Sequence, residues 1–246
     1  YEAALERIAY CFQEFDNVLV AFSGGKDSGV LLNLCYNYAD EHGLLDKLTM
    51  YHLDYEAQYQ MTTEYVTRTF LEQFPGIRKM WYCVPIKAQS ACALGEPYWT
   101  PWDAAKKKLW VRAMPENPYV VHEGNLDVPF RHGMVDYEFQ DKLSRHFAKK
   151  RGTTAVMVGL RADESLNRYA AVARGKKRRS YEGRKWITQT SAVTANVYPL
   201  YDWRVSDIWT ATARFGFDYN RLYDLLYQAG LTAGQMRVAS PFNDCA

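Results

Sequence analysis

The sequence has 246 residues, which is enough for one large domain with a sizeable buried core. Hydrophobic residues make up 48% and charged residues 24%, as is typical of a globular protein, and no apolar run reaches the roughly 18 residues that a membrane span needs. A net charge of +2 is too small to indicate nucleic-acid binding by itself. The first residues lack the basic segment followed by an apolar segment that marks a secretory signal, which predicts a cytoplasmic protein.

Strands and helices alternate along the first third of the chain. Residues 18–22 form a continuous apolar run that ends at two glycines, which predicts a strand buried on both faces of a parallel sheet. Apolar residues then recur at helical spacing over residues 30–38, and the pattern repeats with a strand at 48–53, a helix at 62–74 and a third strand at 80–84. This alternation predicts an α/β fold with a doubly wound parallel sheet, in which ligands lie beyond the carboxyl ends of the strands.

The periodicity fades in the middle of the chain, over residues 86–131. Five prolines interleave there with three tryptophans. Because disordered segments are depleted in aromatic residues, we expect an insertion or lid that packs over another part of the molecule. A covered substrate pocket and a partner surface are both open interpretations.

Regular structure is expected again after the insertion. Apolar spacing and glycine stops indicate a helix, a strand and then two helices in the C-terminal region of about 204–246. The expected ranges are 136–150 for the first helix, 154–158 for the strand, and 205–215 and 221–229 for the last two helices.

The loop between the first strand and the first helix carries residues suited to bind phosphate. A helix N-terminus presents unpaired backbone N–H groups and the positive end of the helix dipole, and glycines let the backbone approach phosphate oxygens closely. An ordinary strand-to-helix turn is the alternative. A Walker A loop is excluded, because Asp27 follows Lys26 where that motif requires Ser or Thr. The loop consists of Ser23, Gly24, Gly25, Lys26, Asp27 and Ser28.

Three segments together resemble one protein family. The loop after the first strand resembles the PP-loop of the N-type ATP pyrophosphatases, a family that includes phosphoadenylyl-sulfate (PAPS) reductases and the small subunit of sulfate adenylyltransferase. Residues 159–165, followed by Arg168, look like the G-[IL]-R-x-x-E-S-x-x-R signature of the sulfate-activating and reductase branch. Residues 198–209 are similar to that branch's P-[LI]-x-x-W-x-x-x-D-[VI]-W segment, which we interpret as structural.

This resemblance implies a single PP-loop nucleotide-binding domain over residues 1–246, with the insertion at about 86–131 and C-terminal helices at about 204–246. The fold would be adenine nucleotide alpha hydrolase-like and Rossmann-like. The implied ligands are ATP, or PAPS or APS, together with Mg²⁺.

The resemblance also implies roles for individual side chains. Lys26, Arg161 and Glu164 are the expected catalytic residues. Arg161 would fork onto a phosphate or sulfate, and Glu164 would fix Arg161 or hold Mg²⁺, with the metal ligands unknown. Asp54, after the second strand, lies where the family recognises the ribose or adenine. Two simpler interpretations stay open: an ion pair between Arg161 and Glu164, and a turn aspartate at position 54. The other expected nucleotide-binding residues are Ser23, Gly24, Gly25, Asp27, Ser28, Gly159, Ser165 and Arg168.

Cysteine usage separates the branches of this family. The five cysteines include no C-x-x-C pair, so neither zinc nor an iron–sulfur cluster is expected. Reductases of the family share a C-terminal E-C-G-L-H nucleophile that the surroundings of Cys245 do not match, which makes a sulfonucleotide reductase the second choice. The tryptophan-rich stretch at 98–115 resembles instead the reductase-like proteins of the immunoglobulin-binding regulator A type, whose genes commonly neighbour a ParB-like partner.

These features predict a protein that cleaves ATP between its α and β phosphates and adenylylates an acceptor. Sulfate, a carboxylate, an RNA base and a DNA phosphate are all open as acceptors. The alternative class is a non-catalytic regulator that senses a nucleotide and binds DNA or a ParB-like partner. Its support is the basic run Arg174–Lys185, where Tyr181 and Trp186 would stack on bases, although a solvated loop is the simpler interpretation.

Overall fold

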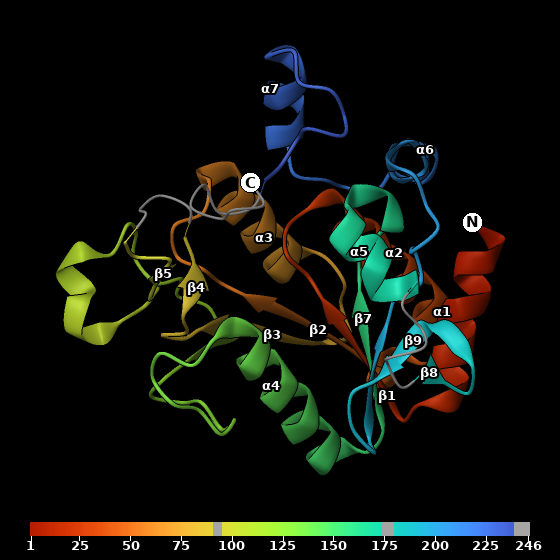
Figure 1. The fold of residues 1–246 in the computed structure, drawn as a ribbon, viewed down its shortest axis with the longest axis horizontal. Helices are drawn as coiled ribbons and strands as arrows, with labels where there is room; N and C mark the ends of the chain where they lie inside the picture. Colours follow the sequence, from red (N-terminus) through yellow and green to blue (C-terminus); the bar gives the residue numbers. More distant parts are fainter. Residues whose placement is uncertain (91–94, 174–179, 239–246) are drawn as a thin grey trace.

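The computed structural model describes residues 1–90, 95–173 and 180–238 and folds them around one large β-sheet (Figure 1). The strands are β1 (Asn17–Ala21), β2 (Leu48–Leu53), β3 (Arg78–Cys83), β4 (Ala88–Gln89), β5 (Tyr98–Trp99), β6 (Val120–His122), β7 (Thr154–Val158), β8 (Ser180–Tyr181), β9 (Arg184–Gln189) and β10 (Thr194–Val197). The α-helices are α1 (Glu2–Glu14), α2 (Lys26–Glu41), α3 (Gln60–Glu72), α4 (Asp136–Arg151), α5 (Leu166–Ala173), α6 (Val205–Phe215) and α7 (Leu222–Gln228). Short 3-10 helices are η1 (Leu45–Lys47), η2 (Ala104–Leu109) and η3 (Ala162–Glu164).

The order of the strands creates a switch point in the middle of the sheet. The order is β6-β3-β2-β1-β7-β10-β9-β8, and all neighbours from β6 to β10 are parallel. The chain builds outward from β1 through β2 to β3 and then returns to place β7 on the other side of β1. The loops that leave β1 and β7 therefore diverge at the carboxyl edge, where ligands bind in such folds. This topology confirms the predicted doubly wound α/β fold.

Alternate residues of the central strand face opposite layers. Val18 and Val20 belong to a buried cluster with α1, α2, α3 and α6, whereas Leu19 belongs to a cluster with α4, which crosses the front of the sheet in Figure 1. Because both layers are apolar, β1 is a continuous apolar run rather than an alternating one. No helix in the described ranges combines the length and apolar character needed to cross a bilayer.

The insertion contributes to the main sheet. Its strand β6 pairs in parallel with β3, while β4 and β5 form a small antiparallel pair of their own. Trp102 is 2% exposed, and its indole Nε1 donates to the carbonyl oxygen of Asp54 at 2.9 Å. The segment that the insertion covers is therefore the loop after β2.

The sequence analysis did not predict the antiparallel strands at the edge of the sheet. β10 extends the parallel region beside β7, and β9 and β8 then run antiparallel. The sequence of β9, R-K-W-I-T-Q, mixes charged and apolar residues, and Ile187 is its buried member. A half-exposed edge strand of this kind has no long apolar run to reveal it.

Phe70 and Leu71 are neighbours on α3 with opposite environments, and they provide a test of the core. Phe70 is fully buried against Trp81 and Tyr119, whereas Leu71 is 51% exposed. Phe70→Ala should lower the free energy of unfolding by about 3–5 kcal/mol, because the truncation leaves a cavity. Leu71→Ala should change it by about 0.5 kcal/mol or less. Urea unfolding followed by circular dichroism measures both, and equal losses would contradict the packing of α3.

Candidate functional site

The loop between β1 and α2 forms a tight turn at the switch point. Helix α2 begins at Lys26, and the backbone N–H groups of its first turn have no acceptor within the helix. Gly24 has a φ of 81°, and a Cβ on it would lie only 2.9 Å from a side chain of α3. The Ser28 hydroxyl accepts from the Ser23 backbone N–H at 3.2 Å and donates to the Gly25 carbonyl at 3.0 Å. The loop is thus closed on itself and presents the N-terminus of α2 beyond the sheet edge.

Gly159, directly after β7, lies against this loop. A Cβ on Gly159 would be 2.8 Å from the Ser28 backbone nitrogen and 2.9 Å from the Asp27 carbonyl carbon. Both are backbone atoms, which cannot swing aside as the end of a side chain can. A glycine is therefore required for β7 and α2 to approach so closely.

Three charged side chains meet at the start of α2. Lys26 Nζ lies 3.0 Å from one carboxylate oxygen of Asp27, and Arg161 Nε donates to the other. Lys26 is 4%, Asp27 9% and Arg161 2% exposed. Buried charges of this kind are stable only when they are paired, so Asp27 holds both cations in place. The trio itself carries one net positive charge, which the exposed carboxylate of Asp163 beside Arg161 offsets in part.

The structure pairs Arg161 and Glu164 with different residues. Arg161 Nη1 approaches Asp163 at 3.4 Å, in addition to its bond with Asp27. Glu164 pairs instead with Arg168, whose Nη1 lies 3.1 Å from Glu164 Oε2, so that this buried oxygen has an ion-pair partner although no hydrogen bond is formed with it among the described residues. The ion pair between Arg161 and Glu164 that the sequence left open is therefore not formed, because Asp27 and Asp163 surround the Arg161 guanidinium.

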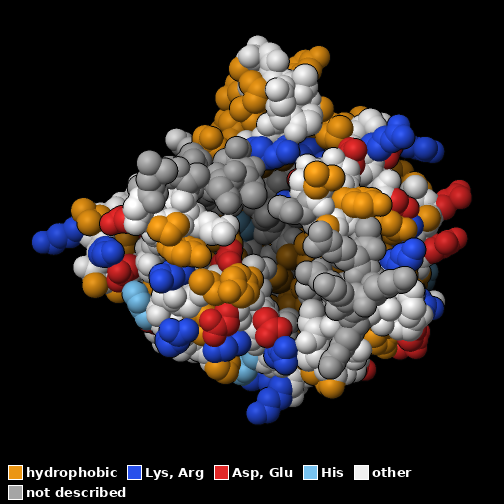
Figure 2. Space-filling model, in the orientation of Figure 1, with side chains coloured by type: hydrophobic (Ala, Val, Ile, Leu, Met, Phe, Trp, Pro, Cys, Tyr) orange, Lys and Arg blue, Asp and Glu red, His pale blue; other side chains and the backbone are white. Residues whose placement is uncertain are grey.

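The loop opens onto a pocket of about 420 Å³, a volume in the range of small-molecule sites. Figure 2 shows a hollow at the centre of this face, with Lys and Arg side chains along its upper rim below α7. Gly24, Asp54 and Arg161 do not contribute to the pocket lining. The other predicted residues line it: Ser23, Gly25, Lys26, Asp27, Ser28, Gly159, Glu164, Ser165 and Arg168.

Tyr223 and Arg237, from the C-terminal part of the chain, complete the pocket and were missed by the sequence analysis. The Tyr223 hydroxyl accepts from the Lys26 backbone N–H at 3.1 Å, and Lys26 Nζ lies 5.4 Å from the centre of the Tyr223 ring. Burial raises the pKa of Tyr223, so the hydroxyl stays protonated. Trp209 packs edge-on against Tyr223 at 5.1 Å, which explains one tryptophan of the structural 198–209 segment.

A buried amide ties the C-terminal part to the phosphate loop. Asn220 Nδ2 donates to the Gly24 carbonyl at 3.3 Å and to the Thr62 hydroxyl at 2.8 Å. The Thr62 hydroxyl in turn donates to the Val238 carbonyl at 3.1 Å. The loop, α3 and the C-terminal segment are therefore connected by side chains that carry no motif in the sequence.

Asp54 makes the turn contact of the simpler sequence interpretation, with the Glu56 backbone N–H, and also makes long-range contacts that neither interpretation foresaw. It is fully buried, and its oxygens accept from Arg112 Nη2 at 2.6 and 2.7 Å. The same carboxylate accepts from Trp81 Nε1 and from the Glu56 backbone N–H, both at 2.7 Å. With its oxygens taken up in this way, Asp54 anchors the insertion to the loop after β2.

The described part of the basic run packs against the protein itself. Residues 174–179 lie outside the described residues. The Tyr181 hydroxyl donates to Glu14 at 2.7 Å, and Trp186 packs edge-on against Tyr10 at 5.7 Å. Both aromatic rings are thus engaged with α1 rather than presented to a nucleic-acid base, which removes the stacking that the sequence suggested for them.

The comparison with protein families agrees with this geometry. The family model described as the phosphoadenosine phosphosulfate reductase domain matches residues 17–229. The chain belongs to this family. Its fold is that of the adenine nucleotide alpha hydrolase-like proteins, and the site described above lies in a PAPS reductase-like nucleotide-binding domain.

Relatives within and beyond the family differ in length and identity. YbdN, an uncharacterised protein of Escherichia coli (strain K12), is 34% identical over 244 residues, and the match covers 98% of this chain but 58% of that protein. FMN adenylyltransferase of Candida glabrata, solved with FMN and an ATP analogue, is 14% identical with a TM-score of 0.50 over 90% of this chain and 58% of its own. PAPS reductase of Candida auris is 16% identical with a TM-score of 0.49 over 90% of this chain and 84% of its own. The two solved structures are similar in fold alone.

Gly159→Ala tests the contact between β7 and the loop. We expect it to weaken nucleotide binding at least tenfold and to lower the free energy of unfolding by about 1–3 kcal/mol, because the new methyl group would push backbone atoms apart. Gly95→Ala is the matched control, since a Cβ there meets nothing within 4 Å. Calorimetric titration with ATP measures the binding. Wild-type affinity in Gly159→Ala would contradict the role of this contact.

Proposed function

We propose that this chain binds ATP, cleaves it between the α and β phosphates, and transfers the AMP group to an acceptor. The observation that carries the proposal is the phosphate loop, a helix N-terminus with the buried Lys26 beside it, which opens onto a pocket. Arg168 and Arg237 line the same pocket and add positive charge for a polyphosphate. Membership of a nucleotide-binding family supports ATP as the ligand.

The proposed reaction is a displacement at the α phosphorus. An acceptor oxygen forms a bond to that phosphorus, the bond to the bridging oxygen breaks, and the electron pair leaves on pyrophosphate. The Lys26 ammonium group and the positive end of the α2 dipole stabilise the negative charge that grows on the leaving group. Asp27 and Tyr223 act through Lys26, because they hold its ammonium group and its backbone N–H in place.

Mg²⁺ fits this pocket as a partner of the phosphates. It commonly takes one or two carboxylates, with phosphate oxygens and waters as its other ligands. Within the described ranges, no group of three or more His, Cys, Asp or Glu side chains is placed to hold a metal ion. Glu164 and Asp27 line the pocket, but Glu164 Oε2 is paired with Arg168 and the two oxygens of Asp27 with Lys26 and Arg161. The ion would therefore be held mainly by phosphate oxygens and waters, and it would neutralise phosphate charge when bound.

Reductase chemistry is a weaker proposal because it needs an accessible thiolate. Cys11, Cys35 and Cys83 are buried, and burial raises the pKa of each thiol. Cys92 and Cys245 lie outside the described residues. Adenylyl transfer requires no thiol and is therefore the function that we prefer.

The buried cysteines yield a test by chemical labelling. At pH 8, Cys11, Cys35 and Cys83 should resist a thiol-specific reagent in the native protein, because a raised pKa keeps each of them protonated and the reagent reacts with thiolates. In urea, all five cysteines of the chain should react. Mass spectrometry of the labelled peptides resolves each site. Rapid native labelling of Cys83 would contradict its burial.

Turnover of ATP labelled at the α phosphate tests the proposed function. With Mg²⁺ present, we expect pyrophosphate together with AMP or an AMP adduct, and Lys26→Ala should reduce the rate about 100-fold or more, since it removes a charge that stabilises the leaving group. Lys142→Ala is the control, because Lys142 lies on α4, outside the pocket lining, in a partly exposed pair with Glu138. Chromatography separates the products, and circular dichroism checks the fold of each variant.

The other products of this experiment lead to other functions. Tight ATP binding without turnover would favour the nucleotide-sensing regulator, with DNA or a ParB-like protein as its partner. ADP as the product would overturn cleavage between the α and β phosphates.

A further inference from the structure

We propose that a second cavity, between the insertion and the loop after β2, binds a planar aromatic molecule that carries an acidic group. The cavity has a volume of about 600 Å³, which is in the range of small-molecule sites. It is distinct from the pocket at the phosphate loop, and its walls come from β5, η2 and residues 56 and 57.

Aromatic side chains dominate the wall that the insertion supplies. Tyr98, Trp99 and Trp110 all line the cavity; Tyr98 is 42% exposed, and the two tryptophans are partly exposed. Exposed aromatic surface in a concave site favours a planar ring, because rings stack or meet edge to face at little entropic cost. The cavity therefore selects a flat ligand rather than an extended aliphatic one.

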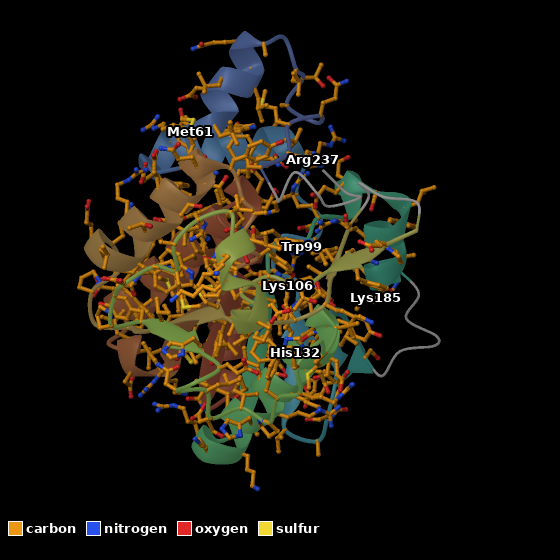
Figure 3. All side chains as sticks on the ribbon, turned by 90° about the vertical axis from the view of Figure 1, so that its left-hand side faces the viewer. Met61, Trp99, Lys106, His132, Lys185 and Arg237 are labelled. Carbon is orange, nitrogen blue, oxygen red and sulfur yellow. The ribbon has the colours of Figure 1, made fainter. Side chains whose placement is uncertain are left out.

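Two acids and one cation line the cavity among the described residues, and the cation, Lys106, offers a contact to an acidic group on that ligand. The Lys106 side chain lines the cavity and is 65% exposed, and its paired carboxylate on Asp103 is 3.9 Å away. Glu56 also lines the cavity, but its carboxylate already accepts two backbone N–H groups of the insertion, at 2.7 and 2.8 Å. Glu96 is the remaining acid, and it is exposed to solvent. Figure 3 shows Trp99 and Lys106 on the same side of the molecule, where a ring and its acidic group would lie.

The loop after β2 and the insertion residue that packs on it are held in an unfavourable backbone conformation. Glu56 and Trp102 have φ values of 62° and 55°, in the left-handed region that non-glycine residues avoid. Arg112 Nε donates to the Glu56 carbonyl at 2.9 Å, and the indole of Trp102 is bonded to the loop after β2. Such residues persist where the surroundings hold them, and they gather at binding sites. The cavity is thus preformed.

The two cavities share the loop after β2 as their dividing wall. Tyr55 and Gln58 line the phosphate pocket, and the two residues between them, Glu56 and Ala57, line the second cavity. Consecutive Cα atoms are about 3.8 Å apart, so the two ligands would lie within the width of one loop. This position suits the acceptor of the proposed adenylyl transfer. That role rests on the proposed function, whereas the binding itself does not.

Calorimetric titration with two pairs of probes tests the site. Flavin mononucleotide and 2-naphthoate carry a phosphate and a carboxylate on a planar ring, and riboflavin and 2-naphthylmethanol are their uncharged counterparts. We expect at least one acidic probe to bind, and its counterpart to bind at least tenfold more weakly. Binding of flavin mononucleotide alone would indicate aromatic phosphates, and binding of 2-naphthoate alone aromatic carboxylates. No binding of either acidic probe, or equal binding of the uncharged ones, would overturn the inference.

Two variants with matched controls locate the binding. Trp99→Ala and Lys106→Gln should each weaken the binding of the acidic probe at least tenfold. Tyr137→Ala, at a 74% exposed ring on α4, and Lys108→Gln, two residues along η2 but outside the cavity lining, should bind as the wild type does. If the control variants lost as much affinity for the probe as the test variants, the probe would bind elsewhere and the inference would be wrong.

The failure of this inference is distinguishable from the failure of the proposed function. Probe binding without ATP cleavage would retain the aromatic site and remove its acceptor role. ATP cleavage without probe binding would retain the proposed function and remove the aromatic site.

Discussion

The carboxylate of Asp27 is the interaction on which the geometry of the phosphate pocket depends. It lies in the first turn of α2, where the helix dipole favours a negative charge, and it holds Lys26 of the same helix and Arg161 from the end of β7. Loss of one partner from a buried ion pair costs about 3–5 kcal/mol, and here Asp27 serves two cations, with the exposed Asp163 as a further partner of Arg161. The carboxylate therefore joins α2 to β7 at the sheet edge and sets the position of Lys26 before a ligand binds.

Local patterns were sufficient to predict the centre of the fold. The bounds of β2 and α6 agree with the ranges 48–53 and 205–215, because β2 is buried along its whole length and Gly216, in the left-handed conformation, ends α6. β6 and β9 were missed for opposite reasons. β6 has three residues inside a proline-rich stretch, whereas β9 has six residues but lies at an exposed edge where packing does not impose an apolar pattern.

The sequence predicted the parts of the candidate site whose residues are contiguous. It did not predict the residues whose roles depend on contacts with distant parts of the chain. The loop at 23–28 and the segment at 159–165 meet as neighbouring strand ends, as a parallel sheet requires. Tyr223 is 197 residues from its partner Lys26, and a tyrosine on a short helix indicates nothing by itself. Asp54 illustrates the same limit, because Arg112, in the insertion, determines that its carboxylate anchors structure instead of facing the pocket.

The bonds from Tyr223 and Asn220 to the phosphate loop also have a consequence for the order of assembly during synthesis. The ribosome releases the loop and β1 early, and domains fold as their segments emerge. Tyr223, which accepts from the Lys26 N–H, and Asn220, which donates to the Gly24 carbonyl, both follow the last strand of the sheet in the sequence. They therefore emerge only after the described strands have been made. A nascent chain that has completed its sheet therefore still lacks a finished phosphate pocket, and nucleotide affinity is acquired only after the sheet is complete.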